Sequence, residues 1–229
     1  MQWLKTYLQF NSIFVIILLE KDLITLISKH MNKKPTKGEY LEVLLRSPKT
    51  IFSIKDVALL WKENDNLVVT DRLKRYVRVG KLVRLRRGFY AKDKNYDSLE
   101  LATRIYTPSY ISFETVLTRE GINFQYYETI FVASYVTRKI KVEKQKISYI
   151  RMKDYVLSNT TAVEQNGNVT IATKERAFLD RIYISKDYHF DNLGSLDWDK
   201  VFAILPIYNN KRMEKKVNTY FKSYKKSKL

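Results

Sequence analysis

One stretch, residues 70–92 with the sequence TDRLKRYVRVGKLVRLRRGFYAK, limits what this chain can fold into because its periodicity changes part-way along. Leu73, Tyr76 and Val77 recur at the spacing of an amphipathic helix. Helices often end at a residue in the left-handed conformation, and Gly80 occupies that position here. After Gly80 the pattern alternates with a period of two, as in a strand. The stretch therefore predicts a helix followed at once by a β-strand.

The strand expected after this helix belongs to a narrow hairpin. Gly88 supplies the turn, and residues 89–91 begin the return strand. Thr70 or Asp71 is suited to cap the helix, whose start is expected between Leu67 and Asp71. Strict alternation places two sets of side chains on opposite faces of the first strand: Leu82, Arg84 and Arg86 on one, and Val83, Leu85 and Arg87 on the other.

The same stretch is strongly cationic, with nine Lys or Arg residues and one acid, Asp71. A helix fits the major groove of DNA, and the tip of a β-ribbon can follow the backbone or the minor groove. Guanidinium and ammonium groups displace counterions from phosphates, which supplies most non-specific affinity. The pattern predicts the recognition helix and wing of a winged helix-turn-helix that binds double-stranded DNA; the alternative is a solvated basic face on an ordinary amphipathic helix. The candidate DNA-binding side chains are Arg72, Lys74, Arg75, Arg78, Lys81, Arg84, Arg86 and Arg87.

The charge of the whole chain points to the same class of partner. A formal net charge of +18 on 229 residues favours a polyanion, either nucleic acid or an anionic membrane surface. The chain has no cysteine, which excludes disulfides and thiolate metal sites and agrees with a cytoplasmic location. An apolar content of 45% is ordinary for a globular protein, so a real core is expected.

Residues 1–34 are expected to be an N-terminal extension, packed as a helix or irregular. The apolar run at residues 13–19 is too short for a spanning helix, which needs about 20 apolar residues. A basic start and a small-residue cleavage site, as in a signal peptide, are not visible. No membrane partner is therefore expected. The sequence from Met31 reads like an ordinary N-terminus, and a translation start there is one hypothesis.

Residues 35–94 have the expected element order of a winged helix domain. A first helix begins near residue 38, and its apolar residues share one face. Ser53 is placed to cap a second helix, in which Trp61 is expected to be a core residue. With the cationic helix and the hairpin, this gives three short helices and a β-ribbon.

Residues 95–229 are expected to form an α/β domain with a small antiparallel sheet and flanking helices, so that the chain as a whole is α+β. A helix is predicted for residues 110–121, and two or three antiparallel strands for residues 128–153. A short strand over residues 169–172 leads into a helix that Thr173 is placed to cap. Four lysines of the expected strands mark an exposed face or a protected edge: Lys139, Lys141, Lys144 and Lys146.

Residues suited to catalysis are few. His30 and His189 are far apart and have no triad-like neighbours, and the glycines are too scattered for a phosphate loop. Ser195 is followed by an Asp-x-Asp pair that starts at Asp197, but a nucleotidyltransferase needs those parts on different elements, so Ser195 or Asp197 is interpreted as a helix cap. We expect no enzymatic activity, no cofactor and no metal site.

One helix in the C-terminal part carries the candidate polar residues Glu175, Arg176 and Asp180. Arg176 and Asp180 are four residues apart, a spacing at which opposite charges pair along a helix. The plain interpretation is an intrahelical ion pair, and the alternative is an acid that faces a partner or acts in catalysis. From Lys211 the chain becomes a basic helical tail that either reinforces contact with a nucleic-acid backbone or is simply solvated.

Three segments, taken in this order, resemble the AbiEi-type antitoxins of bacterial abortive-infection (type IV) toxin–antitoxin systems. They are GKLVRLRRGFYA at residues 80–91, YTPSYISFETVL at residues 106–117 and VTIATKERAFLDRIY at residues 169–183. With their order, they extend the likeness over most of residues 37–205. The wing alone is a common pattern, and the ordered trio is more specific. The first 30 residues have no counterpart in the family.

The resemblance implies a DNA-binding antitoxin. It implies an N-terminal winged helix that represses the family's own operon, and we expect two copies on an inverted repeat. It also implies a C-terminal domain that counteracts a nucleotidyltransferase toxin without a stable complex. Two alternatives stay open: a stand-alone repressor whose C-terminal domain dimerises or senses a ligand, and an enzyme that undoes the toxin's product. No residue for antitoxicity carries over from the family.

Overall fold

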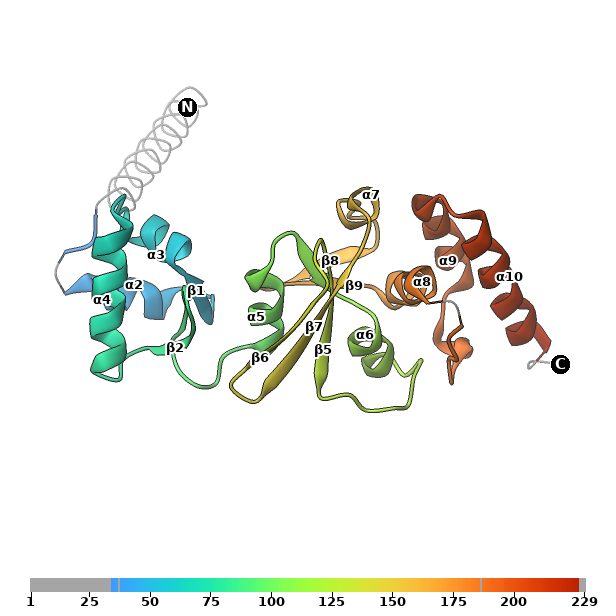
Figure 1. The fold of residues 1–229 in the computed structure, drawn as a ribbon, viewed down its shortest axis with the longest axis horizontal. Helices are drawn as coiled ribbons and strands as arrows, with labels where there is room; N and C mark the ends of the chain where they lie inside the picture. Colours follow the sequence, from blue (N-terminus) through green and yellow to red (C-terminus); the bar gives the residue numbers. More distant parts are fainter. Residues whose placement is uncertain (1–33, 37, 186, 227–229) are drawn as a thin grey trace, which may run out of the picture.

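The computed structural model describes residues 34–36, 38–185 and 187–226. Along its longest axis, the elements of residues 39–91 lie at one end, a six-stranded sheet lies in the middle, and the C-terminal helices lie at the other end (Figure 1). The expectations for an N-terminal extension and for a start at Met31 concern residues outside the described ranges. Among the described helices, none is both long and apolar enough to cross a membrane.

The N-terminal part alternates helices with the strands of a small sheet. Its elements are α2 (Glu39–Arg46), β1 (Ile51–Ser53), α3 (Ile54–Trp61), α4 (Asn66–Arg78), β2 (Val83–Arg86) and β3 (Phe89–Ala91). β3 pairs antiparallel with both other strands, in the order β1-β3-β2. The sequence did not predict β1, because three residues are too few to show a period and become a strand only by pairing with the hairpin.

The caps of α3 and α4 explain where these helices begin. Ser53 caps α3 as predicted, in a capping box with Asp56. The predicted cap at Thr70 or Asp71 is wrong, because Asp65 caps α4 one turn earlier, its carboxylate accepting from Leu67 N at 2.8 Å. The hydroxyl of Thr70 instead donates to the backbone carbonyl of a residue within the helix. The turn that precedes α4 thus supplies the cap itself.

The transition from α4 into the hairpin follows the prediction at both glycines. Gly80 and Gly88 have φ values of +71° and +83°, a region that side chains with a Cβ rarely adopt. The strict alternation of β2 is wrong, however. A register shift between Arg84 and Arg86 leaves Leu85 as the extra residue of a bulge. Leu85 is buried in the cluster of the six-stranded sheet, whereas Leu82 is buried among the N-terminal helices, so the two leucines lie on different sides.

A compact aromatic cluster holds the N-terminal helices together. Trp61 is fully buried, as expected, and its indole Nε1 donates to the backbone carbonyl of Tyr40 at 2.8 Å. The Tyr40 and Trp61 rings meet edge to face, with centroids 5.2 Å apart. Val69 and Leu73 on α4 are fully buried in the same cluster. The buried side of α4 is thereby fixed, and the cationic side is left outside.

The C-terminal part is a mixed sheet with helices on both faces. Its elements are α5 (Ser98–Ile105), β4 (Ser109–Ile111), α6 (Glu114–Arg119), β5 (Thr129–Ser134), β6 (Arg138–Val142), β7 (Gln145–Arg151), α7 (Asp154–Leu157), β8 (Val163–Asn166), β9 (Val169–Ala172), α8 (Lys174–Ile184), α9 (Trp198–Ile204) and α10 (Lys211–Lys226), with 3₁₀ turns at Leu193–Ser195 and Leu205–Tyr208. The strand order is β6-β7-β5-β4-β9-β8. α5 lies against one face, and α6 and α8 against the other (Figure 1).

The expectation of a small antiparallel sheet is wrong in two respects. The sheet has six strands within the described residues, and β5 with β7 and β4 with β9 pair parallel. Residues 110 and 111, predicted as the start of a helix, instead belong to β4 in the middle of this sheet. A short apolar run is compatible with either a helix or a buried strand, and strand direction leaves no local signature. Only pairing with distant strands decides both.

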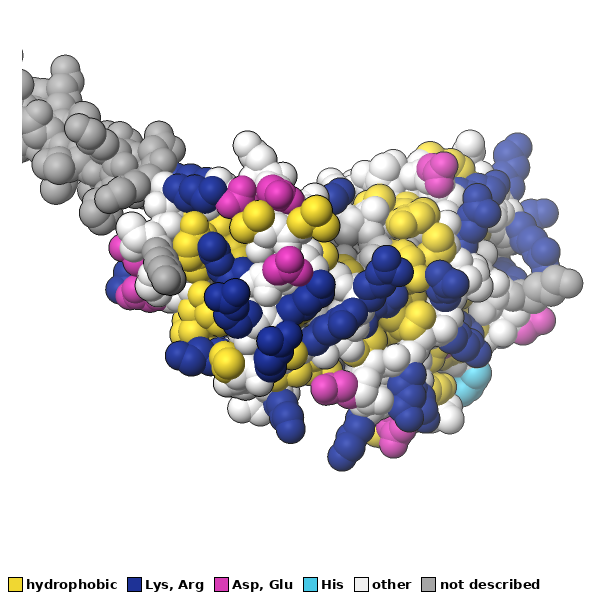
Figure 2. All heavy atoms as spheres, turned by 60° about the vertical axis from the view of Figure 1, so that its left-hand side comes forward, with side chains coloured by type: hydrophobic (Ala, Val, Ile, Leu, Met, Phe, Trp, Pro, Cys, Tyr) yellow, Lys and Arg dark blue, Asp and Glu magenta, His cyan; other side chains and the backbone are white. Residues whose placement is uncertain are grey.

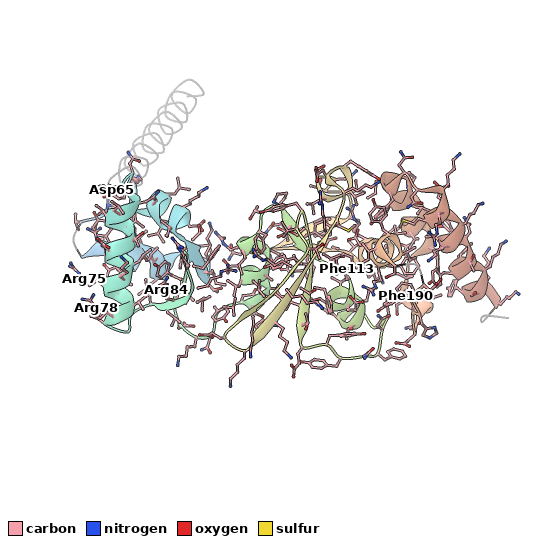
Figure 3. The ribbon with its side chains drawn as sticks, in the orientation of Figure 1. Asp65, Arg75, Arg78, Arg84, Phe113 and Phe190 are labelled. Atoms are coloured by element: carbon pink, nitrogen blue, oxygen red, sulfur yellow. The ribbon has the colours of Figure 1, made fainter. Side chains whose placement is uncertain are left out.

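α10 covers the far end of this part with an aromatic side. Phe190, which Figure 3 places beside α10, packs against Phe178 and Tyr220 with ring centroids 4.7 and 5.3 Å away. Trp198 adds further ring contacts with Phe221 and Tyr224 of α10. The predicted helical tail is therefore a packed element, and the basic residues of α10 other than Lys216 are exposed. Thr173 and Asp197 cap α8 and α9 as predicted.

Candidate nucleic-acid interface

The outer side of α4 carries a group of exposed cations. Lys74, Arg75 and Arg78 are all exposed, because the opposite side of the helix packs into the aromatic cluster. Arg75 and Arg78 point outward from the end of the molecule (Figure 3). Lys74 forms an exposed ion pair with Asp71 at 3.1 Å. Such a pair is weak in water and can exchange for a phosphate.

The hairpin continues this cationic surface, although its arginines differ from one another. Lys81, Arg84 and Arg87 are exposed. Arg86 is half-buried and lies near Tyr149 of β7: burial raises the pKa of that phenol, and the positive charge of Arg86 opposes the rise. Arg86 thus faces the C-terminal part, whereas Arg87 faces solvent.

Arg72 has a different environment from the other candidates on α4. Its guanidinium carbon lies 3.5 Å from the centroid of the Tyr40 ring and 5.5 Å from that of Trp61. Its Nη1 is buried and has no hydrogen-bond partner among the described residues. Arg72 therefore stacks on the aromatic cluster as a cation–π contact. Its main contribution is to packing.

These cations form one basic surface. Figure 2 shows Lys and Arg side chains gathered over the face that turns forward with the N-terminal part, with few acidic ones among them. Six of the eight predicted candidates are exposed on α4, on the hairpin or between them: Lys74, Arg75, Arg78, Lys81, Arg84 and Arg87. A surface of this kind attracts a polyanion and releases its counterions.

Polar contacts fix the hairpin-bearing part against the C-terminal part. The Glu100 carboxylate of α5 accepts from the backbone N–H and the hydroxyl of Thr50, at 3.0 and 2.7 Å. Asp56 of α3 is paired with Arg104 of α5, and with Lys49 at 2.7 Å. Burial alone would raise the pKa of Asp56, but hydrogen bonds from Arg104, Lys49 and Ser53 outweigh it and hold that pKa well below its usual range.

The apolar core also joins the two parts. Ile51, Leu85 and Ala91 of the three-stranded sheet are buried within the large cluster that includes α5 and the six-stranded sheet. The sequence contains no signal for this packing, because the side chains that cover Ile51, Leu85 and Ala91 come from elements far along the chain.

The candidate residues on α8 lie inside the protein. Glu175, Arg176 and Asp180 are 3%, 0% and 0% exposed, so none of the three offers a surface to a partner in this conformation. The intrahelical ion pair is present, with Arg176 Nε 3.3 Å from Asp180 Oδ1. Glu175 accepts from the backbone N–H of Asp197 at 3.2 Å and so joins α8 to α9.

A network of hydroxyl groups surrounds the buried pair. Asp180 accepts from Ser112 at 2.7 Å, from Tyr208 at 2.7 Å and from Tyr110 at 3.0 Å. Arg176 donates to the Val156 carbonyl at 2.7 Å. Burial raises the pKa of Asp180, although Arg176 and the hydroxyl donors oppose that effect. The network joins β4, α7 and α8, so its role is structural.

Phe113 is a feature that the sequence did not reveal. It is fully buried at the junction of β4 and α6 (Figure 3), with φ of 55° and ψ of −139°. A bulky residue pays a steric penalty at positive φ and persists there only when the surroundings impose it. Its two neighbours both contact α8: Ser112 donates to Asp180, and Glu114 pairs with Arg181 at 3.1 Å. The bend at Phe113 positions both contacts.

The described residues contain no group of three or more His, Cys, Asp and Glu side chains that could hold a metal ion. His189 is exposed, and its imidazole lies 3.7 Å from Asp191. His30 lies outside the described residues. In comparisons with known proteins, no family model and no curated protein matches this chain.

Proposed function

We propose that this protein binds double-stranded DNA through a winged helix-turn-helix formed by α2–α4 and the strands β1–β3. The order helix, strand, helix, helix and two-stranded hairpin is the order of that motif, with β1 closing the small sheet. α4 would enter the major groove as the recognition helix. The β2–β3 hairpin would follow the adjacent backbone or minor groove.

One observation carries this proposal. Exposed cations occupy the outer side of two successive elements of different geometry, while the inner sides of both are packed in the core. A solvated basic face on an ordinary helix would not require the neighbouring hairpin to be cationic as well. Arg75 and Arg78 are suited to read bases from α4, and Arg87 to contact phosphate.

We further propose that the DNA-binding activity represses an operon that encodes this chain and a nucleotidyltransferase toxin, which the C-terminal part counteracts without a stable complex. The support is the resemblance of the three segments to AbiEi-type antitoxins. Two of these segments, residues 106–117 and 169–183, meet in space: β4 pairs with β9, and Tyr110 and Ser112 donate to Asp180. They form one structural unit, so their likeness concerns the core of the C-terminal part.

Two measurements test these roles separately. A gel-shift titration with the DNA upstream of the gene should give a specific complex on an inverted repeat, with two protomers bound. Co-expression with the neighbouring reading frame should restore growth if that frame encodes the toxin. If the protein binds the upstream DNA specifically but does not restore growth, the result would support a stand-alone repressor. Absence of preference for the upstream DNA over competitor DNA would refute autorepression.

A stand-alone repressor that senses a ligand is the second candidate, and a hollow between the two parts favours it. The hollow has a volume of about 720 Å³. Its lining includes Ser53 and Asp56 from the N-terminal part and Arg104, Thr107 and Thr170 from the C-terminal part. A polar small molecule bound there would change how the hairpin sits relative to the sheet. Repression that depends on a cell metabolite, in the absence of any toxin, would support this candidate.

A further inference from the structure

The outer face of β6, β7 and β5 forms a second cationic surface, separate from α4 and the hairpin. In the antiparallel pair, Lys139 lies opposite Ser148 and Lys141 lies opposite Lys146. Side chains directly opposite each other project from the same face of a sheet. The three lysines therefore share one face, and all three are exposed. None of the ion pairs among the described residues involves Lys139 or Lys141.

One aromatic side chain lines a hollow together with these lysines, and further aromatic residues precede it in the chain. Phe131 of β5 lies opposite Ser148 of β7, on the same face, and lines a hollow of about 480 Å³ with the lysines. The Tyr127 ring meets the Phe131 ring edge to face, with centroids 5.6 Å apart. Just before it in the chain, Tyr126 and Phe124 are 80% and 72% exposed, so neither is held in the core.

The loop that carries these aromatic residues is held in place by hydrogen bonds. The backbone N–H of Phe124 donates to Asp191 at 2.8 Å, and the Thr118 hydroxyl donates to the carbonyl of Gln125 at 3.0 Å. The Tyr127 hydroxyl donates to the Gln125 side chain at 2.7 Å. The loop and the turn between β6 and β7 lie at the same end of the sheet (Figure 1). The exposed rings are thus presented on a pinned segment, which reduces the entropy lost on binding.

We propose that this face binds a single-stranded nucleic acid, with Lys139, Lys141 and Lys146 contacting phosphates and Tyr126 and Phe124 stacking on bases. A cationic groove bordered by exposed aromatic rings is how proteins hold single strands, whose unstacked bases offer their flat faces. In a duplex the bases stay stacked on one another, so their flat faces are not open to the exposed aromatic rings. Protection of the sheet edge accounts for lysines on β6, but not for Lys146 on an interior strand or for the aromatic loop.

Glu128 provides an internal competitor. Its carboxylate lies 3.4 Å from the ammonium of Lys146, and both side chains are exposed. A phosphate would displace this carboxylate from Lys146. Removing the charge in Glu128→Gln should therefore strengthen binding of a single strand, a gain that a purely structural lysine face would not produce.

The test uses the full chain and fluorescein-labelled strands of about 12 nucleotides, within the range that such grooves accommodate. Oligo(U) and oligo(dT) distinguish RNA from DNA, and a duplex of equal length serves as the comparison. Fluorescence anisotropy gives Kd at several salt concentrations. Lys139→Gln/Lys141→Gln should make the slope of log K against log salt less steep by about 0.7 per lysine, the value for single strands. Phe124→Ala/Tyr126→Ala should raise Kd at least about fivefold, the smallest effect expected for one lost stacking contact.

Two further variants separate this surface from the rest of the chain. Lys215→Gln/Lys222→Gln removes the same charge from the exposed side of α10 and should leave the affinity for a single strand within about twofold, because loss of two remote charges costs only non-specific attraction. Arg75→Ala/Arg78→Ala should weaken duplex binding while sparing single-strand binding. The proposal is overturned if the wild-type chain does not bind either single strand, or if the lysine and aromatic variants leave that affinity unchanged. It is also overturned if they weaken only duplex binding, or if the face instead captures an acidic protein.

Discussion

Asp56 of α3 and Arg104 of α5 form an ion pair that joins the cationic N-terminal part to the six-stranded sheet. Both side chains are largely buried, at 12% and 20% exposure, so the pair is less screened than a surface contact. Lys49 holds the other oxygen of the same carboxylate. One ionised acid therefore contributes two of the contacts that hold the N-terminal part against the sheet.

The first prediction concerns how the free energy of unfolding changes at acidic pH. Because the folded-state pKa of Asp56 is depressed, its stabilisation is present above the unfolded pKa, about 3.9, and is lost as pH falls through the folded value. Asp56→Asn should lower the free energy of unfolding at pH 7 by about 1–3 kcal/mol. The gap between variant and wild type should close as pH falls below about 4. Urea titrations at several pH values measure it, and a gap that is constant with pH would contradict the role of ionisation.

The second prediction separates Arg72 from its neighbours on α4. Arg72→Ala should lower stability by about 1–2 kcal/mol, because it removes a partly desolvated cation–π contact and the packing of the alkyl chain. Arg75→Ala should leave stability within about 0.5 kcal/mol, as for exposed positions generally, but weaken DNA binding. Thermal unfolding and gel shifts measure the two effects. Equal losses of DNA affinity without any change in Tm would place Arg72 in the interface instead.

The third prediction distinguishes Arg86 from Arg87 in the hairpin. Arg87→Ala should flatten the dependence of log K on log salt by about 0.9, as expected for one lost phosphate contact on duplex DNA. Arg86→Ala should change the slope less, because Arg86 faces Tyr149. On α4, loss of Arg75 or Arg78 should relax sequence preference by about 1–3 kcal/mol. Five equal, sequence-independent effects from Lys74, Arg75, Arg78, Arg86 and Arg87 would mean that the helix reads no bases.

The fourth prediction tests whether the buried pair on α8 is structural. Arg176→Met leaves a buried carboxylate without its cation and should cost about 3–5 kcal/mol of stability. Arg176→Met/Asp180→Leu should cost less than the sum of the single changes, because no charge stays unpaired. Lys200→Gln, which breaks the exposed pair with Asp197, should cost below about 1 kcal/mol. Metal-dependent turnover of nucleic acid that Asp180→Asn abolishes without loss of stability would support the enzyme alternative.

The fifth prediction concerns independence of the two parts. A fragment of residues 34–94 should bind operator DNA weakly, because a single module buries little surface and has lost the avidity of pairing. It should also be less stable than the same residues in the full chain. In the fragment, Ile51, Leu85 and Ala91 become exposed to water, because the C-terminal part that buries them is missing. The complementary fragment from residue 96 should keep part of any protection against the toxin while failing to repress. Protection by the N-terminal fragment alone would reverse these roles.

Local patterns predicted much of the candidate site. The period of α4, the positive φ at Gly80 and Gly88, and the caps at Ser53, Thr173 and Asp197 all follow from contacts within a few residues of the chain. The same reasoning failed at Thr70, because Asp65 caps α4 and the helix therefore begins one turn before the predicted cap. It could not separate Arg72 from Arg75, since the ring under Arg72 comes from Tyr40 on another helix.

The sequence by itself determined the charge and period of the α4–hairpin segment, because side-chain spacing and cationic character are properties of neighbouring residues. Tertiary structure alone decided the parallel pairing of β5 with β7 and of β4 with β9, since strand direction is fixed by partners far away in the chain. It also decided the bend at Phe113 and the burial of Asp180. An unfavourable φ or a buried charge persists only where many distant contacts impose it, and no local pattern records those contacts.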